Sequence, residues 1–193
     1  PPEMARATYS ASRERSVGLG VMGFHSYLQA KQIPFESVMA KVWNKKMFEH
    51  IRKYADEASL KLAEERGACP DSQEAHEINP NLPLERFSNK MAIAPTASIS
   101  IIGGNSSPGI EPYAANVFVQ KTLSGSFTVR NKHLDKLLTE KGMNNDDVWA
   151  SVSSSEGSVQ HLDFLEEHEK LTFKTAQEMD QRWVIEHAAD RSE

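Results

Sequence analysis

The sequence predicts a helix-rich α/β protein with few, short strands. Apolar residues recur at helical spacing before residue 67 and again after residue 131. Only the region between them holds the short apolar and β-branched runs that are typical of strands. Two or three short strands do not make a stable sheet alone, so we expect them to belong to a larger sheet.

Length, charge and cysteine content limit the class of protein. A chain of 193 residues is enough for one domain, and no apolar run approaches the roughly 18 residues of a membrane helix. The first residues lack the apolar core of a secretory signal. A net charge of -5 gives no case for nucleic-acid binding. The single cysteine, Cys69, cannot form an internal disulfide, which favours a reducing compartment, the cytoplasm.

Helices dominate the first part of the chain. Residues 1–15 predict a polar loop, and Ser16 is a candidate N-cap for a helix with the apolar stripe Val17, Val21, Phe24 and Leu28. A helix of about 30 residues follows Pro34 and ends at Gly67. Its expected apolar face consists of Val38, Val42, Ile51, Ala55, Ala58 and Leu62. We therefore expect residues 13–66 to be helical.

The middle and the end of the chain differ in character. Residues 68–90 predict a loop or a short helix, and residues 91–94 predict a buried strand. A short helical or irregular stretch at 99–102 and a hairpin around 124–126 complete the segment 91–130. Residues 131–191 are expected to be mainly helical: Asn131 caps a helix that Gly142 ends, 153–158 form a loop, and one last helix covers about 166–189.

The glycines Gly18, Gly20 and Gly23 match the dinucleotide-binding pattern GxGxxG. That motif requires a strand before it and a ribose-binding acid about 20 residues later. Residues 9–15 do not form an apolar strand pattern, and residues 39–41 contain no acid. Glycines on one side of a helix that allow close helix packing are the favoured interpretation.

A better anion-binding candidate is the turn formed by Pro95, Thr96, Ala97, Ser98 and Ile99. The unpaired N–H groups at a helix start, together with the Thr96 and Ser98 hydroxyls, suit an anion. No lysine follows in the manner of a P-loop, and an ordinary capped helix is the alternative.

The histidines and the cysteine give no pattern for a metal. The chain has no Glu-x-x-His, His-x-x-x-His or Cys-x-x-Cys spacing. We therefore expect no metal site on this chain and a structural role for the Cys69 thiol.

Several strings resemble one family. Residues 91–104 (MAIAPTASISIIGG) are similar to the substrate-phosphate loop of the ribonucleotide reductase large subunit. Further similar strings lie, in family order, at 15–24 (RSVGLGVMGF), 107–112 (SPGIEP), 115–118 (ANVF), 122–127 (TLSGSF), 157–162 (GSVQHL) and 180–183 (DQRW). The resemblance thus spans nearly the whole chain.

The resemblance is to class I enzymes and implies a partial ten-stranded α/β barrel that reduces ribonucleoside diphosphates to 2′-deoxyribonucleoside diphosphates by radical chemistry. It implies that Pro95, Thr96, Ala97, Ser98 and Ile99 hold the substrate diphosphate. The implied partners are the rest of the large subunit, a small subunit with a metal-tyrosyl radical, nucleotide effectors, and thioredoxin or glutaredoxin. It also implies a role in deoxyribonucleotide synthesis for DNA replication.

The chain departs from the family in ways that suggest a fragment of the catalytic domain, residues 1–193. Cys69 matches no catalytic cysteine, and no Tyr-Tyr pair occurs. The catalytic cysteines are therefore expected upstream of residue 1 and the paired tyrosines beyond residue 193, as in a split, phage-encoded gene product or an excised piece. An adenosylcobalamin-dependent class II enzyme and a non-catalytic interaction module are the alternatives.

Overall fold

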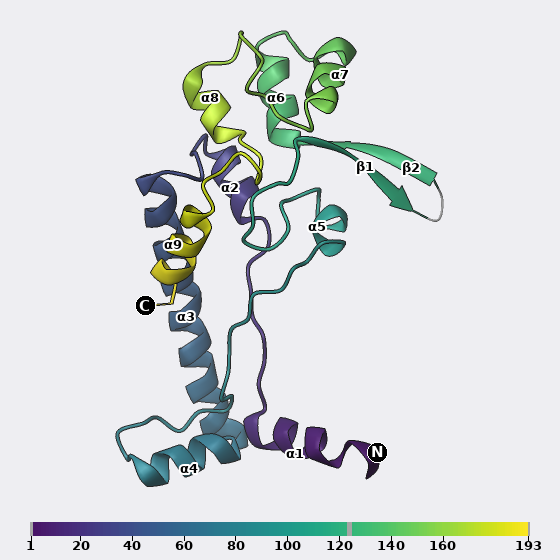
Figure 1. Cartoon of the computed structure of the whole chain (residues 1–193). Coiled ribbons are helices and arrows are strands. Elements are labelled where there is room, and N and C mark those ends of the chain that lie inside the picture. Colours follow the sequence, from purple (N-terminus) through teal and green to yellow (C-terminus); the bar gives the residue numbers. More distant parts are fainter. Residues whose placement is uncertain (1, 123–124, 193) are drawn as a thin grey trace. The chain divides into compact units, whose positions relative to one another are not determined.

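The computed structural model describes residues 2–122 and 125–192, which form two compact units (Figure 1). The first unit comprises residues 1–20 and 46–94, and the second comprises residues 21–45 and 95–193. The long helix α3, Val38–Arg66, begins in the second unit and ends in the first. None of the helices in the described part of the chain has the length and apolar content needed to cross a membrane.

The first unit begins with a helix where the sequence predicted a loop. A 3₁₀ turn, Pro2–Met4, leads into α1, Ala5–Glu14, which packs against α4, Pro70–Ile78. Arg13 at the end of α1 binds two carboxylates of α4, Asp71 at 2.6 Å and Glu74. The loop prediction was wrong because charged pairs, rather than an apolar stripe, hold this helix in place.

The segment that follows α1 is extended, although the sequence predicted a helix from Ser16. The N–H of Val17 donates to the Asn89 carbonyl at 2.9 Å, and the N–H of Leu19 donates to the Lys90 carbonyl at 3.0 Å. A Cβ on Gly20 would lie 2.3 Å from the Ala92 carbonyl oxygen, so glycine lets the two backbones approach. The helix-packing interpretation of the glycines is therefore wrong.

Residues 91–94 were predicted as a buried strand, and this prediction was also wrong. Met91 forms only an isolated parallel bridge with Leu19, and Ala92, Ile93 and Ala94 are exposed. Within the described part of the chain, residues 91–94 have a single extended segment beside them, along one edge only. Their apolar side chains therefore lack the covering layers that bury a strand on both faces.

Helix α3 has the predicted length and ends as predicted, with Gly67 at φ +82°. Its buried face differs from the predicted one, since Val38 and Val42 are exposed. The buried side chains instead include two polar ones, Asn44 and Ser59. Because the buried face contains polar residues, the spacing of apolar residues did not reveal it. The buried positions are Ala40, Asn44, Phe48, Ser59 and Ala63.

The second unit contains the predicted hairpin and the predicted capped helix. The strands β1, Val117–Thr122, and β2, Gly125–Arg130, pair antiparallel, with Val117 opposite Arg130 (Figure 1). Ser124 of the predicted turn and Leu123 before it lie outside the described residues. Asn131 caps α6, Lys132–Glu140, by accepting a hydrogen bond from the His133 N–H at 3.0 Å.

An additional helix, α7, Asp146–Ser154, completes the core of this unit. The sequence predicted a loop at 153–158, and the non-helical segment begins only after Ser154. Helix α7 packs against β1 and supplies a nearly fully buried tryptophan, Trp149. The core of this unit consists of Val117, Leu134, Leu137, Leu138, Val148, Trp149, Val152, Val159, Leu162, Leu165 and Phe173.

The single C-terminal helix predicted at about 166–189 is broken into two. Helix α8 covers Glu167–Thr172, and α9 covers Arg182–Asp190. Between them, the N–H of Thr175 donates to Glu178 Oε2 and the N–H of Asp180 donates to Glu36 Oε1, both at 2.7 Å. These side chains satisfy N–H groups that a continuous helix would bond within itself. Apolar spacing alone does not reveal that side chains compete with the helix for these N–H groups.

Candidate functional site

The turn predicted to bind an anion lies in the second unit, directly before the short helix α5, Ile99–Ile102. We call residues 95–99 the phosphate loop. Thr96, in this loop, has φ +49°, a left-handed conformation that is uncommon for a β-branched residue. Its carbonyl accepts a hydrogen bond from the Ser100 N–H at 2.9 Å, which starts the turn of α5. The helix start predicted here is therefore present.

The two hydroxyl groups predicted to face one anion have different surroundings. Thr96 Oγ1 accepts a hydrogen bond of 2.7 Å from the Gly109 N–H. Ser98 is exposed, stands at the N-cap of α5, and makes no side-chain capping bond. The structure therefore shows an internal partner for Thr96 and leaves the Ser98 hydroxyl accessible to solvent.

The backbone of the phosphate loop offers hydrogen-bond donors. Among the described residues, no hydrogen bond uses the N–H groups of Ala97, Ser98 or Ile99. These residues are exposed, so a ligand can reach their backbone. Consecutive free N–H groups in a turn form a concave site for an anion. Such donors matter here, because residues 91–120 contain no lysine or arginine.

Ser100 supports this loop, although the sequence did not single it out. Its side chain is buried, and its hydroxyl donates to the Ala97 carbonyl at 3.1 Å. The Ser100 carbonyl accepts the Ser106 N–H at 3.0 Å. A serine bonded to a carbonyl three residues earlier is common near helix starts, so the sequence held no specific signal for this role.

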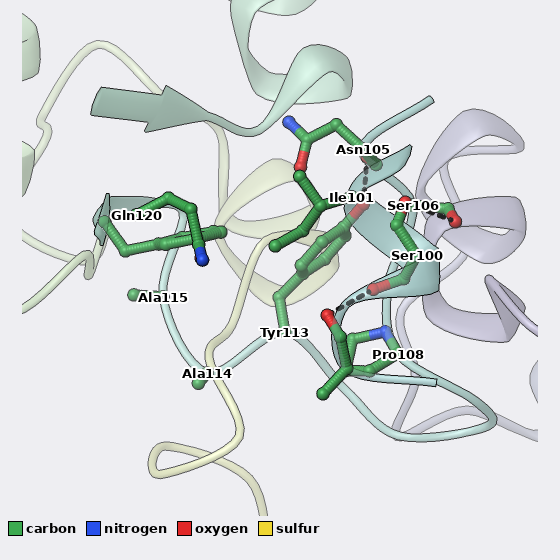
Figure 2. Close-up of a pocket in the computed structure, with 11 residues that line it drawn as sticks. Ser100, Ile101, Asn105, Ser106, Pro108, Tyr113, Ala114, Ala115 and Gln120 are labelled. Atoms are coloured by element: carbon green, nitrogen blue, oxygen red, sulfur yellow. Dashed lines mark hydrogen bonds between the residues drawn. The ribbon is translucent and has the colours of Figure 1, made fainter. Parts of the chain in front are cut away.

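A cavity of about 220 Å³ lies beside the phosphate loop. Its lining includes Ala97, Ser100, Ile101, Tyr113, Phe118 and Gln120. Figure 2 shows Tyr113 pointing towards Ile101 and Asn105, and its hydroxyl donates to the Asn105 carbonyl at 3.0 Å. Burial raises the pKa of the Tyr113 hydroxyl, so it remains a neutral donor.

A buried histidine fixes the backbone of Tyr113. His25, on helix α2 (Phe24–Ala30), accepts a hydrogen bond at Nδ1 from the Tyr113 N–H at 2.9 Å. Burial lowers the pKa of His25 to about 3, so its ring is neutral and Nδ1 can accept. His25 therefore positions the cavity wall and has no exposed face for a ligand.

The described residues contain no group of three or more histidine, cysteine, aspartate or glutamate side chains that could hold a metal ion. Cys69 is buried and stands at the start of α4, where its N–H donates to the Glu85 carbonyl at 2.9 Å. The chemistry that this arrangement supports is the binding of an anion by backbone N–H groups.

Comparisons with known proteins identify the family. The family model described as "Ribonucleotide reductase, barrel domain" matches residues 2–86 and 85–193. The chain therefore belongs to the ribonucleotide reductase barrel-domain family. Its relatives include proteins named ribonucleoside-diphosphate reductase large subunit, from Invertebrate iridescent virus 3 at 45% identity and from Invertebrate iridescent virus 6 at 46%. Both alignments cover 99% of this chain.

A solved structure supports the same assignment. The class Id ribonucleotide reductase alpha subunit of Actinobacillus ureae matches 99% of this chain with a TM-score of 0.86 and 38% identity. This chain spans 33% of that protein, and 30% and 20% of the two viral relatives. The resemblance found in the sequence is thus confirmed, together with the partial barrel fold and the identification as a fragment of a large subunit.

Proposed function

We propose that this chain contributes the substrate-phosphate loop to a ribonucleoside-diphosphate reductase, and that Pro95, Thr96, Ala97, Ser98 and Ile99 hold the diphosphate. The observation that carries the proposal is the set of unpaired N–H groups at Ala97, Ser98 and Ile99. Donors without acceptors at an exposed turn suit phosphate oxygens, and hydrogen bonds to a charged group are strong. Membership of the family supports the choice of a nucleoside diphosphate.

The proposed reaction replaces the ribose 2′-hydroxyl with hydrogen by radical chemistry in the assembled enzyme. Cys69 is buried at the N-cap of α4. We assign the thiyl radical and the redox cysteine pair to other parts of the large subunit. The proposed partners are a small subunit that supplies a metal-tyrosyl radical, thioredoxin or glutaredoxin, and nucleotide effectors. We place the enzyme in the cytoplasm, where thiols stay reduced.

Steady-state kinetics of the assembled enzyme test the phosphate assignment. Ala97→Glu places a carboxylate beside the proposed diphosphate, and we expect the KM for the nucleoside diphosphate to rise at least about 100-fold through charge repulsion. Ser98→Ala removes one hydroxyl donor but leaves the backbone donors, so binding should weaken by about 1 to 2 kcal/mol.

Ala150→Glu is the matched control, because Ala150 is an exposed residue of α7 outside the phosphate loop. It adds the same charge to the chain, and its KM should stay near that of the parent enzyme. An Ala97→Glu enzyme that binds the diphosphate as tightly as the Ala150→Glu enzyme would exclude this loop as the phosphate site.

A further inference from the structure

The conformation of Thr96 requires support from outside the phosphate loop. A β-branched residue at φ +49° is unfavourable, and it persists only where surrounding contacts hold it. The structure provides two such contacts. The Gly109 N–H donates to Thr96 Oγ1 at 2.7 Å, and the Ser100 N–H donates to the Thr96 carbonyl at 2.9 Å.

Gly109 is itself fixed to the start of helix α2. Its carbonyl accepts hydrogen bonds from the N–H groups of Gly23 at 3.0 Å and Phe24 at 3.3 Å. Phe24 and Leu28 of this helix are fully buried. A continuous path of hydrogen bonds therefore runs from a buried helix through Gly109 to the Thr96 side chain.

The Thr96 hydroxyl is the part of this path that a substitution can remove. It accepts from a backbone N–H, so its own hydrogen has to point elsewhere. The side chains of Ser98 and Ile99 are exposed, and the Ser98 side chain makes no capping hydrogen bond. The buried Ser100 hydroxyl holds the Ala97 carbonyl, but this contact lies within the same turn.

We propose that Thr96 is a positioning residue: by accepting the Gly109 N–H, it ties the phosphate loop to helix α2 and so aims the N–H groups of Ala97, Ser98 and Ile99 at one phosphate position. This inference rests on the proposed function of the loop. It adds that the shape of the anion site is set from outside the loop before any ligand binds.

The test compares Thr96→Val with Thr96→Ser in the assembled enzyme. Valine keeps the shape of threonine but cannot accept the Gly109 N–H, whereas serine can. Thr139→Val is the control, because Thr139 is exposed and, among the described residues, its hydroxyl bonds only the Asp135 carbonyl and Asn144 Nδ2, neither of which belongs to the phosphate loop. The readouts are the KM and kcat for the nucleoside diphosphate, the inhibition constant of pyrophosphate, and amide hydrogen exchange at Ser100 and Gly109 without ligand.

We expect Thr96→Val to raise the KM and the pyrophosphate inhibition constant together by about tenfold, with a much smaller change in kcat. Exchange at Ser100 and Gly109 should become faster in the ligand-free Thr96→Val enzyme. Thr96→Ser should restore slow exchange and most of the affinity, and Thr139→Val should resemble the parent enzyme.

Two outcomes separate this inference from the proposed function. A higher KM with unchanged exchange in Thr96→Val would mean that the hydroxyl only contacts the substrate, and it would overturn the positioning role. If pyrophosphate does not inhibit the parent enzyme competitively with the substrate, the phosphate assignment itself is contradicted, whatever the exchange rates show.

Discussion

Asn131 and Asn116 are joined by two hydrogen bonds, both of 2.8 Å, from the Asn131 backbone N–H to the Asn116 carbonyl and from its Nδ2 to Asn116 Oδ1. Nδ2 also donates to Gln29 Oε1 at 2.9 Å, while Oδ1 caps helix α6. Asn131 is only 3% exposed, so this one side chain connects α2, the start of β1 and α6 inside the core.

Replacing this buried cap should cost more than replacing an exposed one. Asn131→Ala removes the cap and leaves the buried oxygens of Gln29 and Asn116 without a donor, so we expect a loss of about 2 to 4 kcal/mol in the free energy of unfolding. Asn145 caps α7 in the same way but is exposed, and Asn145→Ala should cost about 1 kcal/mol. Urea unfolding of both variants measures the difference; equal losses would show that the buried network adds nothing to the cap.

The buried His25 should make the fold sensitive to acid. Its pKa is about 3 in the folded chain, against 6.5 for a free histidine, so the unfolded chain binds a proton that the folded chain does not at any pH between these values. The free energy of unfolding therefore falls as pH falls through this window, by up to about 1.4 kcal/mol per pH unit from this group. Burial also lowers the pKa of His133 and His187, which adds to the slope.

His25→Gln isolates the contribution of His25, because glutamine offers an acceptor for the Tyr113 N–H but does not titrate. We expect this variant to be less stable at pH 7 and to lose less stability than the parent between pH 7 and pH 5. Urea unfolding at both pH values gives the slopes. Identical slopes in the two proteins would contradict the neutral, buried state of His25.

The elements that the sequence predicted correctly are those that depend on local signals. The Asn131 cap, the α6 helix and the paired strands around residue 124 follow from residues close in sequence. The Gly67 terminus of α3 is another case, because a residue with positive φ ends a helix without help from distant parts.

Three of the wrong predictions concern elements that distant polar groups help to determine. Asn44 occupies the buried face of α3 because its Nδ2 donates to the His187 carbonyl at 2.8 Å. Glu36 contributes to the break in the C-terminal helix by accepting the Asp180 N–H, and Arg13 holds α1 through α4. In each case the partner lies more than 50 residues away, so no local pattern predicts the contact.

The candidate site was predictable in its position but not in its construction. The run of small and hydroxyl residues after Pro95 indicated the turn, and the resemblance to the family indicated a diphosphate. The support of Thr96 by Gly109 depends on a contact across 13 positions of chain. The left-handed φ of Thr96 is also unexpected, since threonine disfavours it.

The chain by itself should not reduce ribonucleotides. The proposed chemistry needs a radical cysteine and a redox cysteine pair, and this chain holds one cysteine, which is buried. An assay of the purified chain with a small subunit and reductant should give no deoxyribonucleotide above background. Turnover should appear once the remaining parts of the large subunit are added. Product formed by the chain without them would refute the assignment of roles made above.

The break between α8 and α9 should depend on Glu178. Its Oε2 accepts the N–H of Thr175, which is 4% exposed, and its Oε1 accepts the Ser158 hydroxyl. Glu178→Ala leaves that N–H buried without an acceptor, and we expect a loss of about 2 to 3 kcal/mol in the free energy of unfolding. Glu178→Gln should lose about 1 kcal/mol, because the amide oxygen can accept from Thr175 while Ser158 turns to accept from the amide N–H.

Gln177→Ala is the matched control for both variants, since Gln177 is its exposed neighbour and should change stability by less than about 0.5 kcal/mol. Urea unfolding ranks the three proteins, and circular dichroism reports whether helix content changes. Apolar spacing favours a continuous helix here, so an increase in helix content in Glu178→Ala without loss of stability would show that the carboxylate merely accompanies the break. A loss of stability with unchanged helix content would show that Glu178 stabilises a conformation which the other contacts of residues 173–181 also specify, among them the 2.8 Å bond from the Ala176 N–H to the Tyr113 carbonyl.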